Sequence, residues 1–288
     1  MERFKRALNY LKLSLMAEFT NPIIYAVFIT LFLFIWSSFS GVTSWLTENN
    51  DSLNLFELYT FFGCSFFTNT IYLTVIMFIS CGIFFFHSGS AYYLIRMDKR
   101  TWVNSQIIYM FVMTIIFNIT LLIMFVIACG GKITFEGSWS KAAFAGCSGG
   151  VMQINIVDVI SMLTPGLLTY NPNFIGIVSF FLLTVEGVSA GLLMIWLTMK
   201  RKTVYAVALI FGGQFLDLLA MNEISSKTIA GKIWSYAVPF RMYRVNFSSL
   251  NNGKVSIIYS MIYITVILSV LILLIRRSAA DIDFVKDE

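Results

Sequence analysis

Two acidic residues lie inside stretches that are otherwise apolar enough to enter a membrane. Glu186 stands in LLTVEGVSAGLLM and Asp217 stands in GGQFLDLLA. An ionised carboxylate at the centre of a bilayer costs on the order of 3 kcal/mol on insertion scales, so each side chain should face protein or water. Each acid can line a polar conduit, carry protons in a secondary transporter, or form a hydrogen bond between helices while protonated. The hydrogen bond is favoured for Asp217, near the end of its run, whereas for Glu186 the alternatives stay open.

Other polar and small residues in the apolar runs extend this pattern. Asn118 is a third conduit candidate, although a hydrogen bond between helices is its favoured role. Gly187 and Gly191 follow Glu186 at a spacing of four, and small residues at this spacing let two helices approach closely. The spacing is common in membrane helices, so it indicates close packing without identifying the neighbouring helix.

A basic stretch separates two long apolar runs. Residues 91–102, AYYLIRMDKRTW, carry Arg96, Asp98, Lys99 and Arg100 between the runs 58–86 and 107–128. Lys and Arg in short loops are retained on the cytoplasmic side during insertion, so we predict that this turn faces the cytoplasm.

Motifs for enzymatic chemistry are absent from the sequence. It contains no GxxxxGK[ST] loop to hold ATP phosphates, no HExxH and no GxSxG, and His87 is its single histidine. We therefore predict no catalytic residue, no metal site and no cofactor bound by this chain. Cys129 and Cys147 both fall in a predicted outer segment, where a disulfide between them is an open alternative.

The composition indicates what must hold these residues in place. Of 288 residues, 58% are apolar and 12% are charged, and the mean hydropathy is +0.80, whereas soluble domains are nearer one quarter charged. We predict an all-α integral membrane protein that forms one domain over residues 1–288. The net charge of +5 is interpreted as cytoplasmic Lys and Arg near anionic lipid headgroups, and not as a nucleic-acid site.

Six transmembrane helices are predicted, at about residues 23–39, 58–86, 107–128, 174–199, 204–221 and 255–275. Residues 1–20 predict an amphipathic helix in the membrane interface, and both termini are predicted to be cytoplasmic in a multi-pass cell-membrane protein. The alternative, the basic region of a cleaved signal peptide, is disfavoured by Pro22 and by the lack of an obvious A-x-A site. Residues 222–254 predict an outer re-entrant or hairpin segment before the last helix.

The distribution of basic residues tests this topology. Of the 20 Lys and Arg residues, 13 fall in the predicted cytoplasmic segments 1–20, 87–103, 200–202 and 276–288. The other seven fall in the predicted outer segments 129–173 and 222–254. The bias has the expected sign, and the short loops follow it better than the long ones.

In this layout the chain resembles a permease of the ABC-2 type, the membrane half of an ATP-driven exporter. The resemblance covers nearly the whole length and rests on the amphipathic amino-terminal helix, the six spans, the turn RMDKRTW, the segment WSYAVPFRMYRVNF and the ending RRSAADIDF. The outer segment 129–173 is longer than the family layout leads us to expect.

The resemblance implies a function and a set of partners. Two permease subunits, identical or different, would form a conduit, and separate ATPase subunits that hold ATP and Mg would grip them. The amino-terminal helix and the turn between spans two and three would make the contacts, through the matching residues Arg6, Leu11, Arg96, Asp98, Lys99, Arg100 and Trp102. The cargo expected is amphipathic, either peptide or lipid-like.

Two alternatives belong to other functional classes. One is a proton-coupled secondary transporter that uses Glu186, which requires no ATPase. The other is a non-transporting membrane protein, such as an immunity or sensor subunit, which binds its ligand outside and moves nothing.

Overall fold

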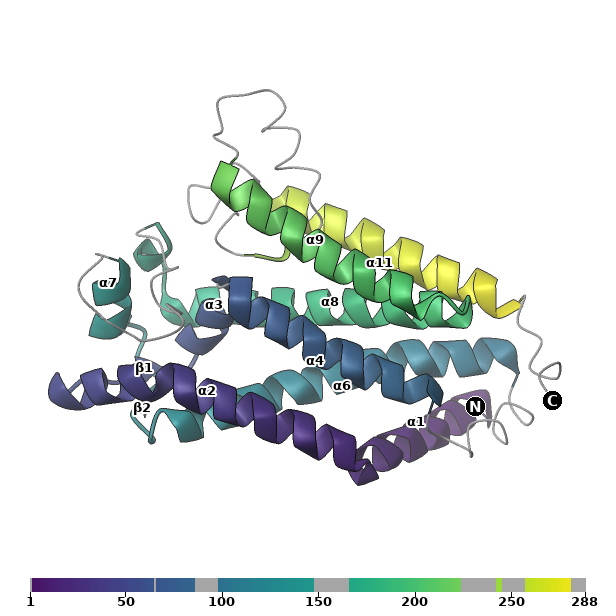
Figure 1. Cartoon of the computed structure of the whole chain (residues 1–288), viewed down its shortest axis with the longest axis horizontal. Helices are drawn as coiled ribbons and strands as arrows, with labels where there is room; N and C mark the ends of the chain where they lie inside the picture. Colours follow the sequence, from purple (N-terminus) through teal and green to yellow (C-terminus); the bar gives the residue numbers. More distant parts are fainter. Residues whose placement is uncertain are drawn as a thin grey trace.

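The structure is a computed structural model that describes residues 2–64, 66–85, 98–147, 166–223, 242–244 and 257–280. Long helices form a bundle, with a small capping region at one end (Figure 1). The helices are α1 (Glu2–Thr20), α2 (Pro22–Glu48), α3 (Glu57–Cys64), α4 (Phe66–Phe85), α6 (Lys99–Ala128), α7 (Lys141–Cys147), α8 (Pro172–Met199), α9 (Thr203–Glu223) and α11 (Ile257–Ala280). The parallel strands β1 (Leu53–Asn54) and β2 (Ile133–Thr134) and the 3-10 turn η1 (Leu167–Thr169) complete the described elements.

Two of the long helices begin at the same dipeptide, Asn-Pro. Asn21 accepts a hydrogen bond from the backbone N–H of Ile23 at 3.0 Å, at the start of α2. Asn171 does the same for Asn173 at 2.9 Å, at the start of α8. The asparagine satisfies a free N–H of the first turn, and proline is tolerated there because its missing N–H would have no partner.

Helix α8 is the centre of the bundle, because α3, α4, α6, α9 and α11 all pack against it. Every residue from 182 to 192 is buried, which is the pattern of a helix surrounded on all sides. Polar side chains on this part of α8 must therefore find partners on the neighbouring helices.

The outward faces of the surrounding helices are apolar. On α6 the exposed apolar residues form one stripe, which consists of Ile108, Ile115, Ile119, Ile123 and Ile127. By length and hydropathy, α2, α6, α8 and α11 each qualify to cross a membrane. This agrees with the predicted helical membrane protein; six crossings remain a prediction.

The predicted second span is divided between two helices. The run 58–86 is not one straight helix, because α3 and α4 meet at a bend of 87° between Glu57–Gly63 and Thr68–Ser80. The Thr68 hydroxyl donates to the backbone oxygen of Phe62 at 3.2 Å and satisfies a carbonyl near the end of α3. Helix α9 runs from Thr203 to Glu223, and the described apolar part of it is Thr203–Asp217.

Two helices extend past the apolar runs predicted as spans. Helix α6 begins at Lys99, so Lys99, Arg100 and Trp102 belong to its first turn and not to a loop. Helix α2 continues to Glu48, past the predicted end at residue 39. Helices can extend beyond the apolar stretch that hydropathy detects. The predicted re-entrant segment 222–254 lies outside the described residues, except for 222–223 and 242–244.

The cap is joined to the bundle by buried carboxylate contacts. Glu57, at the start of α3, is fully buried and accepts the Ser140 backbone N–H at 2.7 Å and its hydroxyl at 2.8 Å. Asp51 accepts the N–H of Ala142 at 3.2 Å. These bonds satisfy amides at the start of α7. Cys129 is a free buried thiol, so the disulfide considered with Cys147 is not formed.

Candidate functional site

Glu186 lies at the middle of α8 and is fully buried, and amide side chains from two other helices surround it. Asn69 of α4 donates from Nδ2 to Glu186 Oε2 at 2.8 Å. Gln214 of α9 donates from Nε2 to Glu186 Oε1 at 3.4 Å and to Asn69 Oδ1 at 2.9 Å. Three helices therefore meet at this carboxyl group.

Asp217 lies close to Arg244, which belongs to the short described stretch 242–244. Asp217 Oδ2 is 3.1 Å from Arg244 Nε, and both side chains are completely buried. Arg244 also donates from Nη2 to Gln214 Oε1 at 3.0 Å. The guanidinium thus contacts Asp217 directly and is linked to Glu186 through the Gln214 amide. We call Glu186, Asn69, Gln214, Asp217 and Arg244 the polar cluster.

Among the described residues, the carboxyl groups of the polar cluster outnumber its guanidinium. The cluster contains two carboxyl groups and one guanidinium, and Arg244 is closest to Asp217. Glu186 accepts its hydrogen bonds from the amides of Asn69 and Gln214, which are neutral. A buried charge is stable only when it is paired or well hydrogen-bonded. The cluster can therefore be neutralised by one proton or by one positive group of a ligand.

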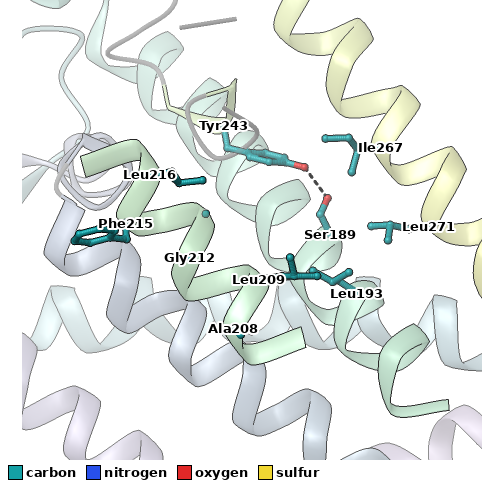
Figure 2. A pocket seen from close by; sticks show the side chains of 12 residues that line it. Ser189, Leu193, Ala208, Leu209, Gly212, Phe215, Leu216, Tyr243, Ile267 and Leu271 are labelled. Carbon is teal, nitrogen blue, oxygen red and sulfur yellow. Dashed lines mark hydrogen bonds between the residues drawn. The ribbon is translucent and has the colours of Figure 1, made fainter. Parts of the chain in front are cut away.

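An apolar cavity lies directly beside the polar cluster. It has a volume of about 620 Å³ and is bounded by α8, α9 and α11 (Figure 2). Leu193, Leu209 and Ile267 are among the apolar side chains that line it. Tyr243 covers one side, and its hydroxyl donates to Ser189 Oγ at 2.9 Å. A concave apolar site of this size with a few polar groups is typical of small-molecule sites.

Short chain distances connect the cavity to the polar cluster. Ser189 and Glu186 lie one helical turn apart on α8, and Tyr243 immediately precedes Arg244. Leu216, which also lines the cavity, precedes Asp217 on α9. A ligand with an apolar part in the cavity would therefore have its polar part close to the charged residues.

Asn118, the third conduit candidate, connects α6 to α8. Its Nδ2 donates to Thr184 Oγ1 at 2.8 Å, and its backbone oxygen accepts the Tyr59 hydroxyl at 3.1 Å. Asn118 is fully buried and does not line the cavity. These contacts agree with the interhelical hydrogen bond favoured for it from the sequence.

Gly187 and Gly191 lie where neighbouring helices approach α8 most closely. A Cβ atom on Gly187 would be 2.5 Å from the Tyr72 hydroxyl and 2.8 Å from Thr114 Cγ2. A Cβ atom on Gly191 would be 2.0 Å from Met110 Cε. The two glycines thus face α4 and α6, and any side chain there would push these helices apart.

The predicted ATPase-coupling residues lie where α1 meets the start of α6. Trp102 donates from Nε1 to the Tyr10 hydroxyl at 3.2 Å, and Gln106 donates from Nε2 to the same oxygen at 2.6 Å. Trp102 is buried and Leu11 packs against the core, so both hold α1 to α6.

Of the other predicted coupling residues, Asp98 and Arg100 are exposed and Lys99 is half-buried. Arg96 lies outside the described residues, and so does the side chain of Arg6, although its backbone belongs to α1.

Three residues of the polar cluster were not predicted from the sequence as candidates. Asn69 and Gln214 are amides in apolar helices, so the rule that selected Asn118 also applies to them. Arg244 falls in a predicted outer segment, where a basic residue is common and gives no signal of a buried site.

Comparison of the chain with protein-family models, with curated proteins and with solved structures found no match.

Proposed function

We propose that this chain is the transmembrane permease subunit of an ATP-driven exporter that moves an amphipathic substrate. The observation that carries the proposal is the polar cluster, buried among α4, α8 and α9 and adjoining an apolar cavity. Ionisable residues inside a membrane bundle are costly and usually mark a transport pathway. Hydrogen bonds between amide side chains would be enough to hold the helices together, and they would avoid the free-energy cost of burying charges.

The chemistry of the site favours a cationic amphipathic substrate. An apolar part of the substrate would occupy the cavity lined by Leu193 and Leu209. A positive group would lie near Glu186, where the carboxyl groups outnumber the guanidinium. Because the cavity has rim residues such as Phe215 that are exposed on the bundle surface, a substrate would enter sideways from the membrane.

Energy would come from a separate ATPase subunit that docks at α1 and at the start of α6. Tyr10 bonds to Trp102 and Gln106, so a push on α1 is transmitted to α6. Helix α6 packs against α8, which carries Glu186. A rigid-body shift of these helices would then open the cavity to alternate sides. In this proposal both termini are cytoplasmic, and a second permease copy or homologue completes the conduit.

Proton coupling is a second candidate function, favoured by the charge imbalance of the polar cluster. One proton on Glu186 would neutralise the site, and an ion gradient would then drive transport without ATP. The two functions differ in energy source and can be separated experimentally.

The test measures uptake of a fluorescent cationic amphipathic peptide into inverted membrane vesicles from the native cells. We expect uptake that requires ATP and persists when the proton gradient is collapsed. Glu186→Gln should lower the uptake at least tenfold at equal protein level. Glu57→Gln, which alters a buried carboxyl group in the cap, is the matched control and should retain it.

Three results would argue against the proposal. Uptake that needs the proton gradient and not ATP would favour the secondary transporter. Unchanged uptake by Glu186→Gln would remove the polar cluster from the pathway. An ATPase subunit that still co-purifies after Lys99→Glu and Arg100→Glu would contradict the docking surface.

A further inference from the structure

A basic groove lies between the start of α6 and the end of α11. It has a volume of about 790 Å³. Four cationic residues line it, two from each helix: Lys99 and Arg100 from α6, and Arg276 and Arg277 from α11. The other residues that line it are the polar Asn104 and the apolar Val103, Leu273 and Ala279. We call this the basic groove.

The walls of the basic groove are held in place by side-chain hydrogen bonds. Arg276 donates from Nη2 to Asn104 Oδ1 at 3.0 Å, which connects α11 to α6. Ser278, on the same turn of α11, accepts from Trp196 Nε1 of α8 at 3.1 Å. The four cations are therefore presented by two helix ends whose relative position is fixed.

The electrostatics of the basic groove favour an anion. The start of α6 carries the positive end of the helix dipole, where cations are unfavourable. Asp98 precedes the helix, but its carboxylate accepts the Thr101 hydroxyl and makes no bond to a backbone N–H of the first turn. A bound anion would offset the helix dipole and would lie among four cationic side chains.

The position of the basic groove indicates which anion. Leu273, on its wall, is 63% exposed and continues the apolar outer face of α11. The cations thus lie where the apolar surface of the bundle ends, which is the level of lipid headgroups in a membrane protein. Basic pockets between membrane helices bind the headgroups of anionic lipids.

We propose that the basic groove binds the phosphate group of an anionic phospholipid, with the upper part of an acyl chain against Leu273. Such a lipid would join the start of α6 to the end of α11. The inference needs only that the helices lie in a bilayer, so it does not depend on the proposed transport function.

The test compares lipid binding by the purified chain in detergent. Phosphatidylglycerol, phosphatidylcholine and inorganic phosphate are titrated separately, with retained lipid measured by native mass spectrometry and the unfolding temperature measured in parallel. We expect phosphatidylglycerol to bind most tightly and to raise the unfolding temperature. Because each cation near a membrane surface contributes roughly a fivefold factor, Arg276→Gln with Arg277→Gln should weaken phosphatidylglycerol binding roughly 30-fold.

Two further variants make the result specific. Lys200→Gln with Lys202→Gln removes the same charge from exposed residues that do not line the basic groove, and should leave binding unchanged. Should the α11 variant fail to fold, Lys99→Gln with Arg100→Gln removes the cations of the opposite wall and should weaken binding by the same factor.

Several outcomes would overturn the proposal. Equal affinity for phosphatidylglycerol and phosphatidylcholine would show that the charges do not select the ligand. Stabilisation by inorganic phosphate that matches the lipid would identify a free anion as the ligand. Loss of an acidic protein partner by the α11 variant, with lipid affinity intact, would identify a protein docking surface.

Discussion

Arg244→Met removes the guanidinium that lies 3.1 Å from the buried Asp217 carboxylate. At an effective dielectric constant of about 20, two unit charges separated by the observed 3.1 Å attract each other by about 5 kcal/mol. In the variant, protonation of one carboxyl group neutralises the negative charge that Arg244 no longer pairs. For an aspartate of ordinary acidity at pH 7 this costs about 4 kcal/mol, roughly three pH units at about 1.4 kcal/mol each.

We therefore expect Arg244→Met to lower the free energy of unfolding by about 4 kcal/mol at pH 7, close to the values measured when one partner of a buried ion pair is removed. Adding Asp217→Asn removes that carboxyl group as well. The loss of unfolding free energy in the double variant should therefore be smaller than the sum of the two single-variant losses, by at least about 2 kcal/mol.

The assay is reversible unfolding in mixed micelles, followed by circular dichroism, for the four members of this double-mutant cycle. Lys202→Met, which removes an exposed cation that does not line the basic groove, is the control and should change the stability by less than about 0.5 kcal/mol. Additive losses, or a loss below about 1 kcal/mol for Arg244→Met, would refute the conclusion that these two charges stabilise each other.

Three other substitutions and labels test the packing. Gly187→Ala should cost about 1–3 kcal/mol in thermal unfolding, because its Cβ would meet Tyr72 and Thr114, whereas Gly212→Ala, with nothing within 4 Å, should be neutral or slightly stabilising. Ser140→Ala should loosen α7 by about 1–3 kcal/mol and increase its proteolysis, because Glu57 loses the Ser140 hydroxyl donor and the Ala143 N–H loses its acceptor. Burial raises the pKa of the Cys129 thiol to about 12, so maleimide at pH 7 should label this position only after unfolding; rapid labelling of the folded protein would contradict the buried thiol.

The sequence predicts a site residue where that residue contrasts with its own neighbours in the chain. Glu186 and Asp217 are acids in apolar runs, and this contrast alone predicts that both are buried polar positions, as they are in the bundle. Their partners were harder to predict because they come from distant segments. Asn69 and Glu186 are 117 positions apart, and no periodicity connects them. Tertiary packing alone brings the polar cluster together.

The helix boundaries show a second limit of sequence reasoning. Hydropathy did not predict the break between α3 and α4, where no proline marks the bend. It also missed the first turns of α6, because a helix that extends beyond the apolar region can include Lys99 and Arg100 at little cost. Apolar length predicts which segments enter the bundle, whereas caps and neighbours decide where each helix ends.

The most direct test of the proposed export function is uptake of the cationic peptide by inverted vesicles from cells with and without this chain, measured with ATP present and the proton gradient collapsed. We predict uptake that depends on both the chain and ATP. Uptake that is equal in both sets of vesicles, or that stops only when the proton gradient is removed, would contradict an ATP-driven exporter.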